Sequence, residues 1–313
     1  MNDWDDYRLI LALARSATLR GAATTLGLTH TTVSRRLAVL QDARGHLFEK
    51  TPEGYRPTPR GDALIDIAER MERLTLAGAR RQSALDEDLS GVVTVSLPEA
   101  VAQYLLLEDL LEFAELYPGV ELRVGTSYRF VDLDRSEADV VVRGAQEPPD
   151  HLVGRRLFPT CVTYYADREY LARTPTHELR WIAPGSDGLW PGWLETSPYP
   201  DAPIAISIDD ITARHRALMQ GLGLGRGACF MADPEPTLVR LTAEPPVPLQ
   251  DFWILTHPDL RQSPRVRALM DFIAGAMLKK RDLVLGRRGD TPVASDHTSP
   301  LHRASGQVRW DMG

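Results

Sequence analysis

A short segment near the N-terminus carries side chains that can hydrogen bond to the bases and phosphates of DNA. Thr31, Thr32, Ser34 and Arg35 stand close together. Arginine can donate two hydrogen bonds to one guanine, and serine or threonine hydroxyls can reach bases or phosphates in the major groove. Arg36 is better placed for the phosphate backbone, a contact that adds affinity but little sequence information. The segment therefore predicts non-covalent recognition of double-stranded DNA.

These side chains must be presented by a helix that turns them away from a core. Val33, Leu37 and Leu40 have the spacing of one apolar helix face, and Arg35 lies roughly opposite it. Thr29 can cap the start of this helix. A solvated face on an ordinary three-helix bundle is the alternative interpretation.

Two further helices and a hairpin are predicted around it. Residues 4–15 and 19–26 show helical apolar spacing, and Gly27 can end the second helix. Residues 46–50 and 54–57 read as two short strands around a turn, which is the pattern of a wing. Together these elements predict a winged helix-turn-helix domain.

Charge is distributed unevenly along the chain, whose net charge is −7. Residues 1–60 contain nine Lys/Arg and six Asp/Glu, a balance of +3, whereas residues 91–285 contain 19 and 27, a balance of −8. A basic module joined to an acidic body is typical of a DNA-binding domain attached to a domain with another role, although solvated surface gives the same asymmetry.

The composition of the chain bears on the cellular location of the protein. The hydrophobic fraction is 43%, no apolar run approaches the roughly 20 residues that span a bilayer, and the N-terminus is acidic. Cys161 and Cys229 cannot form a disulfide framework in a chain of 313 residues. We expect a cytoplasmic protein without a membrane partner.

The sequence gives little indication of cofactor binding, metal binding or catalysis. The glycines at Gly221, Gly223, Gly225 and Gly227 follow a predicted helix, so we interpret them as a helix end and turn before a strand, not as a dinucleotide loop. The eight histidines lack metal-ligand spacing, and no catalytic constellation stands out. We expect no metal, no cofactor and no enzymatic activity.

A long helix is predicted from Pro59 to about Asp86. Its apolar residues follow a heptad spacing, which indicates a seam for a second copy of the chain, formed by Leu64, Ile67, Met71 and Leu74. Packing of this stripe against the chain's own body is the alternative.

Strands and helices alternate between residues 91 and 285, which predicts an α/β domain with parallel crossover units. The expected strands are 92–97, 120–125, 139–143, 161–166, 181–183, 204–208, 228–230 and 251–256. The expected helices are 100–116, 130–135, 210–220 and one that begins at Ser263-Pro264. Residues 286–313 are polar and aperiodic, which predicts a mobile tail.

The sequence resembles the LysR-type transcriptional regulators. In the N-terminal part the resemblance rests on Ala22-Ala23, Leu26-Gly27-Leu28-Thr29, Val33-Ser34-Arg35-Arg36-Leu37, Leu40, Leu47-Phe48-Glu49-Lys50, Arg56-Pro57-Thr58 and Gly61. A looser match extends through Leu111, Phe113, Tyr117-Pro118, Ala138–Arg143 and Gly221-Leu222-Gly223. The family's DNA-reading positions correspond to His30, Thr31, Ser34 and Arg35, and its wing arginine to Arg56. His30 stands where glutamine is common in the family. The resemblance therefore does not determine which bases are read.

The resemblance also implies a two-lobed effector domain like a periplasmic binding protein, with a ligand between the lobes. Carried over by position, the cleft residues are Pro98, Glu99, Ala100, Thr126, Ser127, Arg143, Pro184, Gly185, Ser186 and Asp209. Glu99 would repel an anion at a helix start, and Arg143 is a candidate partner for it. A non-anionic ligand, or none, stays open beside a carboxylic acid.

The expected division is a winged domain at 1–58, a linker helix at 59–88 and an effector domain at 89–285. Within the last, lobe I covers about 89–160 and 258–285, and lobe II about 161–257. The implied function is that of a regulator, dimeric or tetrameric on a pseudo-palindromic promoter site, with a small-molecule effector and RNA polymerase as further candidate partners. A transporter's solute-binding protein explains only the C-terminal lobes, and an enzyme would need a constellation that the sequence lacks.

Overall fold

The computed structural model describes residues 4–84, 89–127, 137–185 and 192–287. The chain divides into two compact units, with the boundary between Ser83 and Ala84. Each unit is described by itself.

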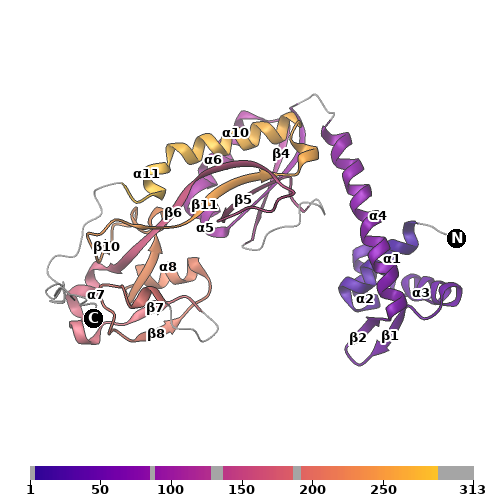
Figure 1. The fold of residues 1–313 in the computed structure, drawn as a ribbon, viewed down its shortest axis with the longest axis horizontal. Helices are drawn as coiled ribbons and strands as arrows, with labels where there is room; N and C mark the ends of the chain where they lie inside the picture. The colour runs from indigo at the N-terminus through magenta and orange to yellow at the C-terminus, as the bar shows by residue number, and fades with distance from the viewer. Residues whose placement is uncertain (1–3, 85–88, 128–136, 186–191, 288–313) are drawn as a thin grey trace, which may run out of the picture. The chain divides into compact units, whose positions relative to one another are not determined.

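The N-terminal unit is a winged helix-turn-helix. Its elements are α1 (Trp4–Ser16), α2 (Leu19–Leu26), α3 (His30–Arg44), β1 (Phe48–Thr51), β2 (Gly54–Pro57) and α4 (Pro59–Ala84) (Figure 1). Gly27 ends α2 in the left-handed region at φ 65°, and the Thr29 hydroxyl caps α3 by accepting from the amide of Thr32. The predicted boundaries are confirmed to within one or two residues.

The core of this unit forms where the three helix stripes meet. Val33, Leu37 and Leu40 of α3 are buried together with Ala22 and Ala23 of α2, as their spacing predicts. Small alanine side chains let α3 cross close to α2. The opposite face of α3 is thereby turned to solvent.

Thr58 joins the wing to α4. Its buried hydroxyl donates to the carbonyl of His46 at 2.8 Å, and accepts from the amide of Gly61 at 3.1 Å. A Cβ at Gly61 would lie 2.1 Å from the Leu47 carbonyl oxygen, so this close approach requires glycine. The start of α4 is therefore held against the first strand of the wing.

The C-terminal unit is built on one sheet that both lobes share. Within the described residues it has nine strands in the order β4-β3-β5-β11-β6-β9-β7-β8, with β10 paired to β6. The strands are β3 (Gly91–Leu97), β4 (Val120–Thr126), β5 (Val140–Ala145), β6 (Val153–Asp167), β7 (Trp181–Ala183), β8 (Ile204–Ser207), β9 (Leu224–Ala228), β10 (Leu238–Arg240) and β11 (Val247–Thr256).

The helices lie along this sheet. They are α5 (Glu99–Val101), the π-helical turn η1 (Ala102–Leu106), α6 (Leu107–Leu116), α7 (Arg168–Arg173), α8 (Ile211–Met219), α9 (Cys229–Ala232), α10 (Pro264–Lys279) and α11 (Arg281–Val284), with 3-10 turns η3 (Thr176–Glu178), η4 (Gly192–Leu194) and η5 (Pro258–Leu260). In α10 the predicted face of Val266, Leu269, Ile273 and Met277 is fully buried against lobe I.

The relative direction of paired strands distinguishes the strands within each lobe from the two strands that connect the lobes. The pairs β3–β4, β3–β5, β7–β8 and β7–β9 are parallel, as expected for crossover units. Two long strands, β6 and β11, pair with each other antiparallel and run through both lobes (Figure 1). They connect the two lobes.

Four sequence predictions need correction. The strand predicted at 161–166 begins earlier, at Val153, and its first half pairs with β11. The strand predicted at 228–230 is β9, Leu224–Ala228, and Cys229 already begins α9. Gly225 and Gly227, two of the glycines predicted to form a turn, pair with β6 as part of this strand, and a Cβ at them would crowd Leu218 and Tyr165. The helix predicted at 100–116 is interrupted by η1.

A fifth correction concerns the C-terminal tail. The sequence pattern places Gly286 in a mobile segment, but this residue is buried against Cys229 and Pro246, with φ at 67°. Arg287 lies in the described part as well. The rest of the predicted tail, and the helix predicted at 130–135, lie outside the described residues.

We expect Thr58→Val to destabilise the N-terminal unit by about 1–2 kcal/mol, because it removes a helix cap and leaves a carbonyl with one acceptor bond fewer. Native-state hydrogen exchange of the buried amides of α1 to α3 measures this loss. Thr24→Val is the matched control, since the exposed Thr24 hydroxyl only bonds back to Arg20 in its own helix. Equal protection in the two variants would contradict the role given to Thr58.

Candidate nucleic-acid interface and ligand cleft

The predicted DNA-contact residues lie on the first two turns of α3 and on one strand of the wing. Four are exposed and three are half-buried: His30, Thr31, Arg35 and Arg56, then Thr32, Ser34 and Arg36. The half-buried group flanks the apolar stripe, as the helical spacing requires. The surface therefore presents short hydroxyls around a few guanidinium groups.

The hydroxyls at the start of α3 form a cluster that fixes their positions. The oxygen of Thr29 lies 3.0 Å from the hydroxyl of Thr31 and 2.8 Å from that of Thr32. Hydroxyls that bond to one another lose rotamer freedom before any ligand arrives, which reduces the entropy lost on binding. Sequence reasoning identified Thr29 only as a cap and missed this second role.

The arginines of the surface differ in how far they are already neutralised. Arg36 lies 4.0 Å from the carboxylate of Asp5 in α1, and Arg56 stands opposite Glu49 in the hairpin register. Arg35, in the part of the chain that the structure describes, makes no hydrogen bond or ion pair through its guanidinium and is exposed. Arg35 is therefore the cation best prepared to accept a new partner.

The wing is held in a defined position relative to α3. The side-chain oxygen of Gln41 accepts from the amides of Leu47 and Phe48, at 3.1 and 3.0 Å. At the other end the amide of Tyr55 donates to the carbonyl of Ala17 at 2.7 Å. Gly54 comes so close to Ala17 that a Cβ would lie 2.2 Å from that same oxygen. Neither set of hydrogen bonds was predicted, because a bond to a partner outside the residue's own helix or strand leaves no periodic pattern in the sequence.

In lobe I the predicted cleft residues meet at the carboxyl ends of β3 and β4. Leu97 pairs with Thr126 in the parallel register, and the amide of Ser127 donates to the Leu97 carbonyl at 3.0 Å. Pro98 and Glu99, which follow β3, therefore lie beside Thr126 and Ser127. Ala100 is buried and offers only its backbone.

Arg143 and Glu99 have different described partners. The Arg143 side chain is 2% exposed, and donates to the Val142 carbonyl at 2.8 Å and to the Ser96 hydroxyl at 2.9 Å. Burial lowers its pKa to about 10, so it stays charged at neutral pH. The Glu99 carboxylate accepts from the amide of Gln103 at 2.8 Å. Arg143 braces β5 against β3 from within the lobe.

In lobe II the predicted residues gather at the carboxyl ends of β7 and β8. Ala183 pairs with Ser207, so Pro184 and Gly185 come next to Asp209. A Cβ at Gly185 would lie 1.6 Å from an Asp209 carboxylate oxygen, which means that the carboxylate rests on the glycine backbone. Ser186 lies outside the described residues. The described edges of the two lobes thus carry the carboxylates of Glu99 and Asp209.

Two aromatic side chains that the sequence did not single out connect the lobes. The ring of Tyr104, on η1 in lobe I, meets that of His215, on α8 in lobe II, edge to face with 5.1 Å between centroids. His215 also lines a cavity of about 20 Å³, close to the size of one water molecule, together with Ile211, Arg226 and other residues of lobe II. None of the predicted cleft residues lines this cavity.

The protonation of His215 is controlled by its surroundings. Its side chain is 3% exposed, and its Nε2 lies 3.8 Å from a Glu235 oxygen, too far for a hydrogen bond. Burial lowers the pKa of His215 to about 4. Burial also raises the pKa of Tyr104, with the charges of Glu235 and Glu99 acting in the same direction. Both rings are therefore neutral at pH 7.

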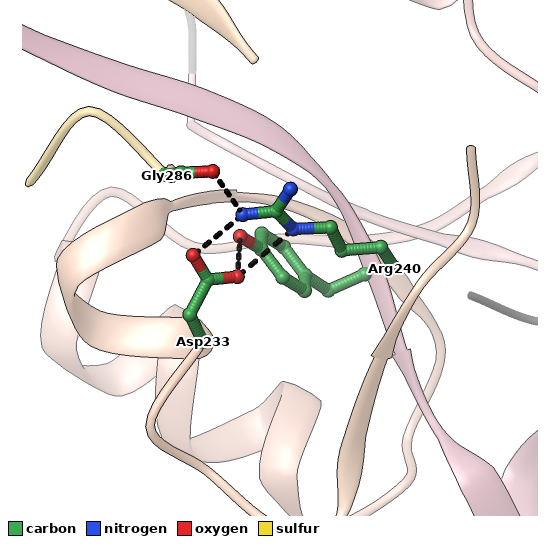
Figure 2. A network of polar contacts seen from close by, with 4 residues as sticks. Asp233, Arg240 and Gly286 are labelled. Carbon is green, nitrogen blue, oxygen red and sulfur yellow. Dashed lines mark hydrogen bonds and ion pairs between the residues drawn. The ribbon is translucent and has the colours of Figure 1, made fainter. Parts of the chain in front are cut away.

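A buried polar network ends lobe II (Figure 2). Arg240 donates to both oxygens of Asp233, at 3.0 and 2.6 Å, and to the Gly286 carbonyl at 2.8 Å. The Tyr165 hydroxyl donates to Asp233 at 2.7 Å. Burial raises the pKa of the neighbouring Cys229 thiol to about 12, and burial also raises that of Cys161. Raised thiol pKa values favour unreactive structural cysteines.

The described residues give no sign of two other kinds of site. No group of three His, Cys, Asp or Glu side chains among them could hold a metal ion. No helix among them is both long and apolar enough to span a membrane.

Comparison with known families matches both units. Residues 4–62 match the family described as bacterial regulatory helix-turn-helix protein, lysR family, and residues 86–278 match the LysR substrate binding domain. The second match alone covers more than half of the chain.

Individual relatives extend over nearly the full length. The Mau operon transcriptional activator of Paracoccus denitrificans is 24% identical and covers 87% of this chain and 95% of its own. The structure of CrgA, a LysR-type transcriptional regulator from Neisseria meningitidis, is 21% identical with a TM-score of 0.53, over 88% of this chain and 98% of its own. A cysteine variant of full-length OxyR from Pseudomonas aeruginosa is 18% identical with a TM-score of 0.56, over 88% and 98%. At these identities the solved structures establish the fold.

We expect His215 to make the C-terminal unit less stable in acid. Its pKa is about 4 in the folded chain and about 6.5 when unfolded, so between these values the unfolded chain binds the extra proton. Stability is therefore lost as the pH falls from 6.5 towards 4, by about 2 kcal/mol at pH 5. Urea unfolding at pH 7 and pH 5 measures this, and His215→Gln should lose correspondingly less. His177→Gln, at an exposed histidine, should behave like the wild type; equal pH dependence in all three proteins would refute the assignment.

Proposed function

The chain belongs to the LysR family of transcriptional regulators, and from this we propose that α3 and the wing bind double-stranded promoter DNA in a sequence-specific way. Arg35, with His30, Thr31 and Ser34, contacts base edges in the major groove, while Thr32, Arg36 and Arg56 contact phosphates or the adjacent minor groove. The observation that carries the proposal is the exposed guanidinium of Arg35 on the polar face of α3.

We propose that α4 joins two chains into a dimer. Of the predicted seam, Leu64 packs with Ile65 against the core of its own N-terminal unit, so the seam proper begins one turn later. Ile67 is 42% exposed and Leu74 is 74% exposed, with Met71 half-buried between them. Apolar side chains left exposed at heptad spacing favour a matching helix as partner. Two winged domains would then meet two half-sites about 34 Å, or a multiple of it, apart.

We propose that a small-molecule effector binds between the lobes and biases their arrangement. Support comes from Pro98, Glu99, Thr126 and Ser127 on one sheet edge and from Gly185 and Asp209 on the other. Because both edges carry a carboxylate, a cationic or neutral ligand fits better than a carboxylic acid. Lobe movement would alter the spacing of the DNA-binding units and so the affinity or bend at the promoter.

Further assembly, to a tetramer through the C-terminal units, is part of the same proposal, as is contact with RNA polymerase. Location in the cytoplasm and the absence of a catalytic role follow from the proposed task and from relatives that are transcriptional regulators. A regulator that ignores its cleft is the alternative, and it differs only in its response to ligands.

We expect Arg35→Ala to weaken binding to a selected operator by about 1–3 kcal/mol and to relax the preference at one base pair, because a bidentate base contact is lost. Arg56→Ala should weaken binding to all sequences alike and reduce the salt slope by about one. Fluorescence anisotropy at several salt concentrations, on DNA recovered from a random-sequence selection, measures both. Arg70→Ala, an exposed arginine on α4 paired with Asp66, is the control. If Arg35→Ala matches this control on every sequence, the proposed contact face is wrong.

We expect the double substitution Met71→Glu with Leu74→Glu to abolish one association step, because four like charges would face each other across the seam. Sedimentation equilibrium of the full chain detects the change, and binding to a two-half-site operator should lose its cooperativity. Ala79→Glu adds one of the same charges away from the seam and should leave both properties unchanged. An undisturbed sedimentation profile in the double variant would exclude this seam.

A further inference from the structure

A cavity of about 590 Å³ opens on lobe I, away from the proposed effector cleft. It is lined by Val153–Arg155 at the start of β6, by Thr256 at the end of β11, and by residues around the start of α10. Thr256 pairs with Val140, the first residue of β5. The cavity therefore lies at the amino-terminal edge of the parallel strands β3 and β5, whereas Pro98 and Thr126 lie at their carboxyl edge.

The charged groups of this cavity are mostly arginines. Arg155, Arg261 and Arg267 line it, and its carboxylate is Asp271. Asp271 is already engaged by Arg155 in an ion pair. Across the described residues no hydrogen bond or ion pair involves the guanidinium of Arg261 or of Arg267. The lining thus holds two positive charges in excess, within a unit whose net balance is −8 between residues 91 and 285.

Arg261 and Arg267 are both exposed and line one concave surface, so a single ligand with two anionic groups can meet both guanidinium groups. Guanidinium groups also bind phosphate and carboxylate oxygens through paired hydrogen bonds, which gives specificity as well as affinity. Gln262, on the same wall, adds an amide that can donate to an anionic oxygen. The volume is in the range of small-molecule sites, and the side chains of Val153 and Met270 supply an apolar portion.

We propose that this cavity binds a small molecule that carries at least two anionic oxygen groups, phosphate or carboxylate. Arg261 and Arg267 hold the anionic groups, and Gln262 orients them. The Arg155–Asp271 pair forms the rim and limits the positive charge. This site is separate from the effector cleft, whose described edges carry carboxylates, so one chain has two sites of opposite preference.

The proposed site lies near the start of β3, the first strand of the C-terminal unit. Gly91 begins β3 at this same edge of the sheet, and a Cβ there would lie 3.9 Å from the guanidinium of Arg265 in the first turn of α10. A ligand bound at the start of α10 would therefore lie near Arg265, whose side chain approaches the first residue of β3, the strand that follows the linker in sequence.

Isothermal titration of the full-length protein, without DNA and at constant ionic strength, tests the proposal. The probes are inorganic pyrophosphate and citrate, with acetate as a monovalent control. We expect saturable binding of one pyrophosphate or citrate per chain, and weaker binding of acetate. The double substitution Arg261→Gln with Arg267→Gln should weaken the binding at least about tenfold, which corresponds to about 1.4 kcal/mol.

Two further variants make the outcome decisive. Arg180→Gln removes an exposed arginine of lobe II and should bind like the wild type. Asp271→Asn removes the carboxylate of the rim, frees Arg155, and should bind more tightly. Absence of saturable binding, equal binding in the double variant, or loss in Asp271→Asn would each overturn the proposal. So would binding confined to an acidic polypeptide such as polyglutamate. Because no DNA is present, these results stand apart from those on promoter binding.

Discussion

The antiparallel pairing of β6 with β11 is the constraint on which the C-terminal unit depends. From Thr256 opposite Val153 to Val247 opposite Val162, the two strands stay paired through both lobes. The parallel strands of lobe I attach through β5 to β11, and those of lobe II attach through β9 to β6. Neither lobe has a complete sheet without this pair.

The backbone of the two strands determines where they bend. The register shifts on both sides of Asp251, and Asp251 stands opposite Pro159, with Pro248 a few residues away. Proline lacks the amide that a ladder needs, and a bulge adds local twist. Arg156 bonds to the carboxylate of Asp251 at 2.7 Å and secures the lobe I side of the irregularity. The irregularity of the strand pair is therefore confined to the stretch around Asp251.

In lobe II, beyond the irregularity around Asp251, the buried network of Asp233 and Arg240 joins separate segments of the chain (Figure 2). Asp233 has a side chain that is 2% exposed, and such a charge is tolerated only when its partners satisfy it fully. Arg240 and Tyr165 do so, and the bond from Arg240 to Gly286 attaches the end of the described chain to lobe II. In the N-terminal unit Gln41 and Thr58 have a comparable task, because they fix the wing against its neighbouring helices. In both units a few polar contacts thus fix segments that are separate in the sequence.

The winged domain could be derived from the sequence almost completely. Its apolar stripe, the cap at Thr29 and the stop at Gly27 are local patterns, and local patterns determine helices and their exposed faces. The alternating strands and helices of the C-terminal unit were found for a similar reason, since β-branched runs and turn residues alternate regularly, whereas the two lobes were implied by the family resemblance. What the tertiary structure alone decided are the contacts between distant segments. Gly225 lies in a strand, with Leu218 in the space that a side chain would take, and Arg143 turns to a serine within its own lobe. The same holds for the arginines that converge on one cavity from β6, η5 and α10. Such choices depend on which surfaces meet, and a one-dimensional pattern carries the spacing within an element but not the partner across it.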